Sequence, residues 1–383
     1  MVMEARLGYI ALNGMDRVGP VRAKALLDRF GDVAGLFRAS AAELMTVPGI
    51  GKELARSISD QFDSINPEAE VRKAEAFGAR IVTLADEDYP ERLRTVYDPP
   101  LALYVWGSLL PSDRHALAVV GTRHPTHYGI SMADRLAYGM AKAGITVVSG
   151  LARGIDTAAH QAALKGGGRT LAVLGGALDK LYPAENRKLA EAIAEQGAVL
   201  TEYPFGRSPD RTTFPYRNRI VSGLSQGIVV VEAGAQSGAV ITANQALEQG
   251  RSVYAVPGRV DNLSARGCHT LIRAGAMLCE SLDQILEDLS MLLPTSVSRE
   301  AKALEPMPEP NLSEAERQVV KALWKGALQT DALAREAGIG SAQLSAMLLG
   351  LEMKRVIRIL PGRVVELRGE VKPAPELESG ANR

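Results

Sequence analysis

Cysteine is scarce in this sequence: Cys268 and Cys279 are the only two among 383 residues. Two isolated thiols in so long a chain exclude a disulfide framework and predict a reducing compartment. Long apolar runs are also missing, and none approaches the roughly 18 residues that span a bilayer. The opening stretch, MVMEARLGYIALNG, carries an early acid and does not have the pattern of a signal peptide. We therefore expect a soluble, cytoplasmic protein with no membrane partner.

Neither charge is in excess, because Lys plus Arg and Asp plus Glu both number 44. A basic surface for nucleic acid would have to come from local segregation of charge, and global neutrality argues only weakly against one. Apolar residues make up 46% of the chain, which is ample for a sizeable core. The length of 383 residues predicts two or three domains.

The middle of the chain, residues 67–289, alternates short apolar runs with amphipathic stretches. The runs are ALAVV, ITVVS, TLAVLG, AVLTEY, IVVVEA, SVYAVP and AMLC. Short apolar strands that alternate with helices predict a parallel sheet covered on both faces. An upstream segment, RIVTLADEDYPERL followed by PPLALYVWG, adds one or two strands. We expect an α/β core built on an extended Rossmann-like parallel sheet.

Residues 1–66 predict short helices separated by glycine turns. RVGPVRAKALLDRFG and TVPGIGKELARSISD resemble each other, and each has a glycine hairpin before a helix, as in a helix-hairpin-helix (SAM-like) domain. One interpretation is phosphate contact, with the backbone N–H groups of Gly49, Ile50 and Gly51 facing an anion beside Lys52. A helical domain used only for packing or protein contacts explains the same pattern. The residues leave both interpretations open.

Beyond the core, residues 290–312 have the composition of a linker, with four prolines among Ser, Glu and Lys. Residues 313–369 predict three helices and a two-stranded wing, which is a winged helix, and residues 370–383 form a tail. Ser313 and Glu316 fit a capping box at the first helix. The third helix, residues 341–355, is poor in exposed cations, so it fits a protein-binding role at least as well as DNA reading.

Three familiar motifs fail on inspection. The dinucleotide fingerprint needs a second glycine where the chain has Arg123, and the next strand ends in VSG without an acid, which argues against a hydride-transfer cofactor. GLSQG at 223–227 has a helical pattern before it and a strand after it, the reverse of a nucleophile elbow. His124 and His127 lie in a turn with Pro125, which favours a loop or capping role over metal ligation.

Four glycine-rich turns follow predicted strands, at residues 121–129, 149–156, 175–188 and 232–242. The carboxyl ends of parallel strands lie at one edge of a sheet, where α/β proteins bind ligands. The loop predicted over residues 206–220, GRSPDRTTFPYRNRI, carries four arginines against Asp210, with Phe214 and Tyr216 between them. Such a segment suits single-stranded nucleic acid, because cations follow the backbone and rings accept any base. An ordinary solvated loop with Arg–Asp pairs is the alternative, but beside the other turns we favour the nucleic-acid groove.

The sequence offers no catalytic residue, metal site or cofactor site. Asp156 and His160 are one turn apart on a predicted helix, yet no nucleophile–base pair is forced by spacing. We expect Asp156 to cap its helix and to order the preceding loop through Arg153. The enzymatic alternative is a nucleotide phosphoribohydrolase, whose P-G-G-x-G-T-x-x-E pattern compares with residues 232–238 here. No acid follows until Glu248, so that chemistry is expected to be missing.

Taken in order, the turns resemble the DNA-processing protein A family (DprA, also called Smf). The matching stretches run from Ala118 to Gly258 and include VVGTRHPTHYG, VSGLARGIDTAAHQAAL, TLAVLGGALDKLYPAEN, FPYRNRIVSGLS and VVEAGAQSGAVITANQALEQGR. The resemblance implies a dimeric, non-enzymatic mediator without a cofactor. It would protect incoming single-stranded DNA in natural transformation and load the RecA recombinase onto it.

The resemblance also implies which residues hold the DNA. Arg123 is the leading phosphate contact, and a basic pocket comprises Lys180, Arg187, Lys188, Arg217 and Arg219. Close backbone approach or N–H groups come from Gly121, Ser149, Gly150, Gly154, Ser237 and Gly238, and we add Arg153, Phe214 and Asn218 to the predicted site. One departure is GCH at 267–269 where the family usually has glycine–threonine–asparagine. It puts the asparagine's contact in doubt and is neutral if His269 supplies an equivalent donor.

Overall fold

The computed structural model describes residues 5–62, 64–289, 312–323, 326–353, 356–360 and 362–367. The chain divides into two compact units, residues 1–304 and 305–383, each of which is described by itself. The predicted linker (290–312) lies outside the described residues except for Leu312, and the predicted tail lies wholly outside them. Within the described ranges no helix is both long and apolar enough to cross a membrane.

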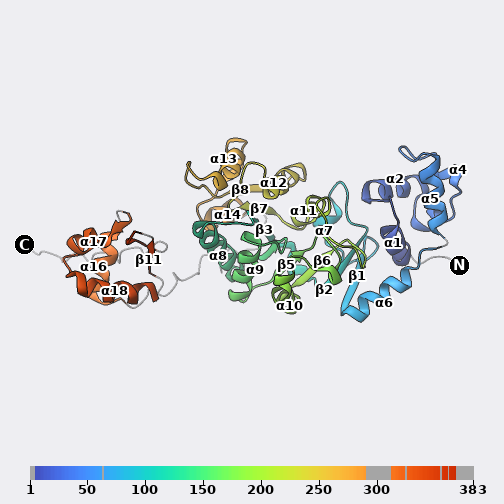
Figure 1. The fold of residues 1–383 in the computed structure, drawn as a ribbon. Coiled ribbons are helices and arrows are strands. Elements are labelled where there is room, and N and C mark those ends of the chain that lie inside the picture. Colours follow the sequence, from blue (N-terminus) through green and yellow to red (C-terminus); the bar gives the residue numbers. More distant parts are fainter. Residues whose placement is uncertain are drawn as a thin grey trace, which may run out of the picture. The chain divides into compact units, whose positions relative to one another are not determined.

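A nine-stranded sheet forms the centre of the first unit (Figure 1). Its strands are β1 (Ala79–Thr83), β2 (Ala102–Gly107), β3 (Ala116–Val120), β4 (Thr146–Ser149), β5 (Thr170–Val173), β6 (Ala198–Thr201), β7 (Gly227–Val230), β8 (Ser252–Ala255) and β9 (Met277–Leu278). Their order is β1-β2-β6-β5-β4-β3-β7-β8-β9. The seven strands from β6 to β9 pair in parallel, while β1 and β2 add an antiparallel edge. The predicted Rossmann-like α/β class is confirmed.

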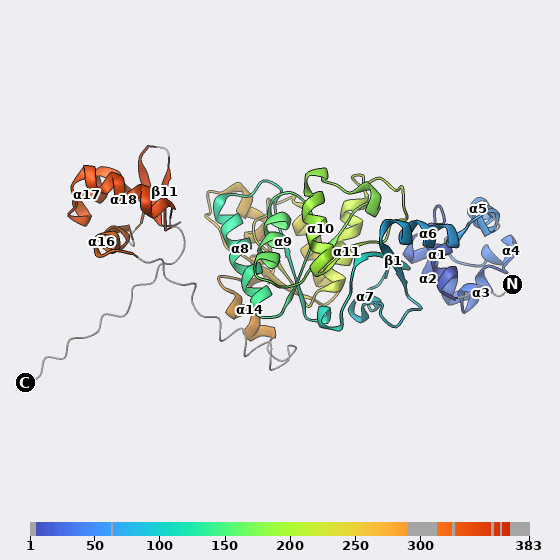
Figure 2. The ribbon, with the colours of Figure 1, turned by 90° about the horizontal axis from the view of Figure 1, so that it is seen from below.

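Helices cover both faces of this sheet, as its fully apolar strands require. They are α8 (His127–Lys142), α9 (Ile155–Lys165), α10 (Arg187–Gln196), α11 (Thr213–Leu224), α12 (Gly238–Glu248), α13 (Arg266–Arg273) and α14 (Leu282–Leu289), with the short α7 (Glu91–Arg94) before β2. Figure 2 shows α8, α9 and α10 side by side. Along β3, Ala118 packs into a core with Ile220 of α11, whereas Leu117 and Val119 pack into another with Leu136 of α8. Side chains that alternate across a strand thus build two cores.

The segment 206–220 differs from its prediction as a loop, because α11 begins at Thr213. Asp210 nucleates the helix: its Oδ1 accepts the N–H groups of Thr212 at 2.8 Å and of Thr213 at 3.1 Å. These are donors that a helix start would otherwise leave unpaired. Pro215 is tolerated because it lies in the first turn, where no intrahelical donor is needed. The GLSQG stretch joins α11 to β7, as predicted, and therefore forms no nucleophile elbow.

Six helices precede the sheet: α1 (Ala5–Gly14), α2 (Pro20–Phe30), α3 (Val33–Leu36), α4 (Ala41–Leu44), α5 (Lys52–Phe62) and α6 (Pro67–Phe77). The first five enclose a small core that includes Leu26 and Ile58. In the second hairpin the N–H of Ile50 bonds the Val47 carbonyl at 3.1 Å, so it is not one of the donors facing an anion. Asn13 reaches out of the helical domain, donating from Nδ2 to the Glu202 carbonyl at 2.9 Å.

The second unit has the predicted three helices, α16 (Glu314–Ala322), α17 (Thr330–Ala337) and α18 (Ser341–Met353). The wing strands β11 (Ile357–Leu360) and β12 (Val364–Leu367) are joined by a short third strand, β10 (Leu328–Gln329), in the order β10-β12-β11. The capping box is confirmed, since Ser313 N–H donates to Glu316 at 2.8 Å and Glu316 N–H donates to the Ser313 hydroxyl at 3.3 Å. Between Ser341 and Met353, α18 contains no lysine or arginine.

Candidate nucleic-acid interface

Parallel pairing brings the four predicted turns to one edge of the sheet. β3 lies between β4 and β7, and the strand order runs outward from it in both directions. That reversal is a topological switch point, at which α/β sheets leave a crevice beyond their carboxyl ends. The turns after β3, β4 and β5 and the start of α11 converge on this crevice, which we name the edge site.

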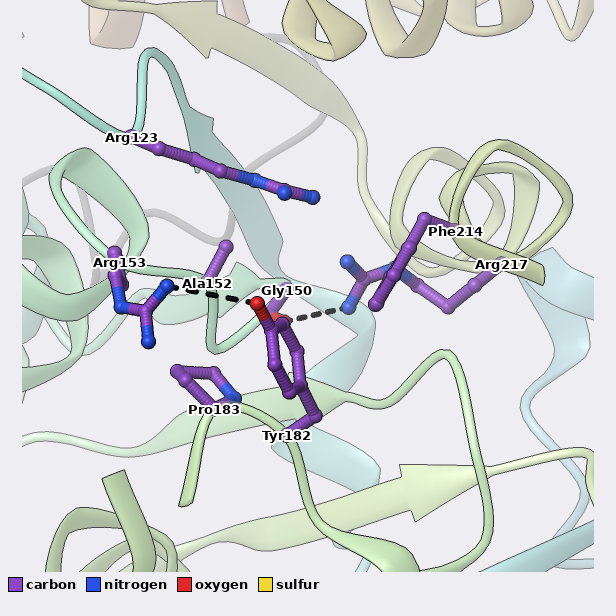
Figure 3. Close-up of a pocket in the computed structure, with 8 residues that line it drawn as sticks. All are labelled: Arg123, Gly150, Ala152, Arg153, Tyr182, Pro183, Phe214 and Arg217. Atoms are coloured by element: carbon purple, nitrogen blue, oxygen red, sulfur yellow. Dashed lines mark hydrogen bonds between the residues drawn. The ribbon is translucent and has the colours of Figure 1, made fainter. Parts of the chain in front are cut away.

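A small pocket occupies the edge site (Figure 3). Its lining is Arg123, Gly150, Ala152, Arg153, Tyr182, Pro183, Phe214 and Arg217. Arg123 and Arg153 enter from one side and Phe214 and Arg217 from the other, with Tyr182 between them. Five predicted residues are therefore brought together: Arg123, Gly150, Arg153, Phe214 and Arg217.

Tyr182, Pro183 and Ala152 were not predicted as members of the site. Tyr182 lies on the turn after β5 and is 44% exposed. The sequence did contain a signal for Tyr182. An aromatic residue that precedes a proline in a glycine-rich turn is not part of a strand or helix that would bury it, so its ring is expected at the surface. Only the fold shows that this ring lies 5.8 Å from that of Phe214, centroid to centroid.

Cations and rings alternate along the pocket. The guanidinium carbon of Arg123 lies 5.3 Å from the Phe214 ring centroid, and that of Arg153 lies 5.7 Å from the Tyr182 centroid. Both distances are within the range of a cation–π interaction. The arrangement offers charge for phosphates and flat apolar faces for bases in one small space. Those are the two components of a single-strand binding surface that does not read sequence.

Arg217 forms the floor of the pocket rather than its rim. Its side chain is buried, and Nη1 donates to the carbonyls of Gly150, at 2.6 Å, and Val173. Burial lowers the pKa of Arg217 to about 10, so it stays charged at neutral pH. The buried carboxylate of Asp156 faces that charge and holds the pKa of Arg217 from falling further. Arg217 thus joins α11 to the ends of β4 and β5.

The prediction that Asp156 caps its helix and orders the preceding loop through Arg153 is wrong in both contacts, since Gly154 is the N-cap of α9 and no side-chain bond caps it. Asp156 Oδ2 accepts the N–H groups of Gly150 at 3.1 Å and Ala152 at 3.4 Å, which fixes the turn directly. Arg153 is instead ion-paired with Glu185 on the turn after β5. Both side chains of that pair are about half exposed, at 49% and 53%. The pair spans 32 residues of sequence, so local spacing gave no sign of it.

Arg219 does not join the basic pocket predicted for it. Its side chain is 4% exposed, is ion-paired with Glu202 and lies 3.2 Å from Asp98, with its guanidinium 4.4 Å from the Tyr216 ring centroid. Residues two apart on a helix point to different sides, so Arg217 and Arg219 cannot line one pocket. Arg219 therefore anchors the opposite side of α11.

The remaining predicted residues fall into two groups. Lys180, Arg187 and Lys188 are exposed around the turn after β5 but do not line the pocket. Several others serve the framework: the Ser149 hydroxyl donates to the Val119 carbonyl at 2.6 Å, the Ser237 hydroxyl accepts the Ala239 N–H at 3.1 Å, and Asn218 donates to the Gly238 carbonyl at 3.4 Å. Gly121 packs closely on Ile155, and Gly154 adopts a positive φ of 79° that favours glycine.

Glu232, the candidate acid of the enzymatic alternative, is buried and engaged at both oxygens. Oε2 accepts the Thr126 N–H at 2.9 Å, and Oε1 accepts the Asn262 amide at 3.1 Å. The cap of α8, which begins at His127, is Thr126 and neither of the two histidines: the Thr126 hydroxyl accepts the Gly129 N–H at 3.2 Å. His269 at the departure from the family pattern bonds the Gly258 carbonyl at 2.9 Å. Across the described residues, no group of three or more His, Cys, Asp or Glu could hold a metal ion.

Comparison with known proteins finds a family model for each of the three predicted domains. The family model described as DNA recombination-mediator protein A matches residues 80–290, the DprA winged helix domain matches 303–363, and the SAM-like helix-hairpin-helix tandem matches 9–63. Protein Smf from Synechocystis is 33% identical over 384 residues, with 92% of this chain and 96% of the relative covered.

Two solved structures are also similar. The X-ray structure of DNA processing protein A from Streptococcus pneumoniae matches with a TM-score of 0.65 and 32% identity, over 75% of this chain and 99% of that one. The protein from Helicobacter pylori matches with a TM-score of 0.51 and 30% identity, over 56% and 97%. That structure concerns the single-stranded DNA binding mode of the Helicobacter pylori protein.

Replacing Arg219 with methionine should destabilise the first unit by about 3 kcal/mol or more, because the buried Glu202 and the partly buried Asp98 lose the cation that pairs with them. Burial already raises the pKa of both carboxyls, so they protonate more readily in the fold than in the unfolded chain. The loss should therefore shrink as pH falls. Urea unfolding across pH 5–8 measures it, and adding Glu202→Gln should restore part of the stability. An unchanged midpoint would contradict the anchoring role.

Proposed function

The chain belongs to the DNA recombination-mediator protein A family, and from that premise we propose that it is a DNA-processing recombination mediator that binds single-stranded DNA at the edge site. The resemblance predicted from the sequence is confirmed by the family match over residues 80–290. The observation that carries the proposal is the pocket in which Arg123, Phe214, Tyr182 and Arg153 alternate charge with aromatic faces. The description of the Helicobacter pylori structure supports the choice of ligand.

The chemistry of the pocket explains a preference for single strands. Arg123 and Arg153 reach the phosphates, while a base lies against Phe214 or Tyr182. A base can use a ring face only when it is free of its partner strand, so a duplex forfeits the stacking contribution of about 1–3 kcal/mol per base. The exposed cations Lys180, Arg187 and Lys188 extend the positive potential beside the pocket. The affinity is then similar for strands of different sequence, and it falls steeply as the salt concentration rises.

The finer assignments are part of the same proposal. The protein would protect incoming DNA and load the RecA recombinase in natural transformation, acting as a homodimer without a catalytic residue or cofactor. Exposed apolar side chains support self-association: Leu247 on α12 is 48% exposed and Leu278 on β9 is 46% exposed. Among the described residues β9 is the last strand of the sheet and pairs only with β8, and an open sheet edge is a ready template for contact with another chain.

Arg123→Ala should weaken binding roughly 10- to 100-fold, and to a similar extent for unrelated single strands, because a phosphate contact carries no sequence information. The slope of log affinity against log salt should fall by about one. Fluorescence anisotropy over a salt series measures both quantities. Lys165→Ala is the matched control, since this exposed cation ends α9 at the opposite edge of the sheet. Equal effects of the two variants would contradict the assignment of Arg123.

Glu185→Gln should tighten binding about two- to fivefold, because it removes the carboxylate that competes with a phosphate for Arg153. The gain is small because an exposed ion pair is weak and is screened by salt. Glu195→Gln, an equal change of charge near the far end of α10, should leave the affinity nearly unchanged. Unaltered or weaker binding by Glu185→Gln would show that Arg153 does not meet the DNA.

The enzymatic alternative is tested separately. Glu232 is held by Thr126 and Asn262 and is not free to act on a substrate. We therefore expect no release of free base from nucleoside monophosphates by the purified protein, as followed by chromatography. Base release that is abolished by Glu232→Gln would instead establish a phosphoribohydrolase.

A further inference from the structure

The loop after β8, residues 256–265, presents apolar side chains to solvent without an evident structural reason. Val260 is 86% exposed, which makes it the most exposed large apolar side chain of the described residues, and Leu263 is 64% exposed. Single exposed apolar residues are common on protein surfaces. Here two exposed apolar side chains lie on one short loop, beside the exposed cations Arg259 and Arg266. The surface of the loop is therefore both apolar and positively charged.

The backbone of this loop is well anchored. The Tyr128 hydroxyl donates to the Pro257 carbonyl at 2.9 Å, and His269 Nε2 lies 2.9 Å from the Gly258 carbonyl oxygen. Asn262 donates to Glu232 at 3.1 Å and accepts the Ser264 N–H at 2.9 Å. The loop is therefore fixed while its apolar side chains stay outside the core. This is the geometry of a preorganised contact surface, since little conformational freedom remains to be lost on binding.

The same carboxylate connects the loop to the edge site. Glu232 Oε2 accepts the N–H of Thr126, which lies three residues after Arg123. From β5 to β8 the strands at this edge follow the order β5-β4-β3-β7-β8. The distance from β5 to β8 is therefore four inter-strand spacings, or about 19 Å. At the 3.4 Å spacing of a stacked strand, that length is covered by about six nucleotides, and an extended strand needs fewer. Between β3 and β8, the turn AGAQSG at 233–238 contains no acidic residue that would repel a phosphate.

We propose that the loop 256–265 is a second contact for single-stranded DNA, reached by a strand that leaves the pocket past Arg123 and crosses the turn after β7. Val260 and Leu263 lie against the faces of unpaired bases, as apolar side chains do around extruded bases. Arg259 exchanges its exposed partner, Asp261 at 2.9 Å, for a phosphate. The inference rests on the proposed function and adds to it a direction for the strand and a minimum length for full affinity.

The test compares oligothymidylates of 4 to 20 nucleotides bound to three full-length proteins: the wild type, the double variant Val260→Ser/Leu263→Ser, and the control Leu110→Ser. Leu110 is 45% exposed and precedes β3, at the opposite edge of the sheet.

The wild type and the control should gain affinity as the oligonucleotide becomes longer, until the strand spans both the pocket and the loop. The double variant should stop gaining at a shorter length and bind a 12-mer about tenfold more weakly. Arg259→Gln should lower the salt slope for the 12-mer by about one.

Three results would overturn the assignment, and they are distinguishable. Superimposable length curves for the double variant and the wild type would show that the strand does not reach the loop, while the edge site would stand. A change in sedimentation of the double variant without DNA would assign Val260 and Leu263 to contact between copies of the chain. Failure of the wild type to bind any oligonucleotide would remove the proposed function itself.

Discussion

The buried guanidinium of Arg217 holds the edge site together. A charge in the interior is tolerated only when it is paired and hydrogen-bonded. Arg217 meets both conditions by donating to the Gly150 and Val173 carbonyls and by facing Asp156, which itself accepts two N–H groups of the same turn. Three segments distant in sequence are thereby fixed to one another. The position of Phe214, one helical turn earlier on α11, follows from that attachment.

The two sides of α11 have separate tasks. One side carries Phe214 and Arg217 into the pocket, whereas the other carries Arg219 to Glu202 and Asp98. The Glu202 carbonyl also accepts the amide of Asn13, so the helical N-terminal domain contacts the residue that anchors this helix.

Local segregation of charge accounts for a basic site in a chain of zero net charge. At the pocket Arg123 lies over the Phe214 ring and Arg153 over the Tyr182 ring, so each cation has an aromatic face against it. The exposed carboxylate of Glu185 is paired with Arg153, and such an exposed pair competes only weakly with a phosphate. Because these cations are exposed and only weakly paired, little free energy is needed to desolvate them when a polyanion binds.

The sequence by itself determined the sheet, the turns and the place of Arg123, because apolar runs of strand length leave few alternatives and parallel strands end at a common edge. The winged helix and its capping box were also predicted from the sequence, because both follow from patterns of residues that are close together in the chain. Tertiary structure alone decided which arginine enters the pocket. Arg217 and Arg219 point to different sides of α11, and partners from distant segments decide which of them faces the crevice: the Gly150 and Val173 carbonyls hold Arg217, whereas Glu202 and Asp98 hold Arg219. It also decided that Arg153 pairs with Glu185 and that Tyr182 faces Phe214, since each contact joins segments about 30 residues apart in the chain.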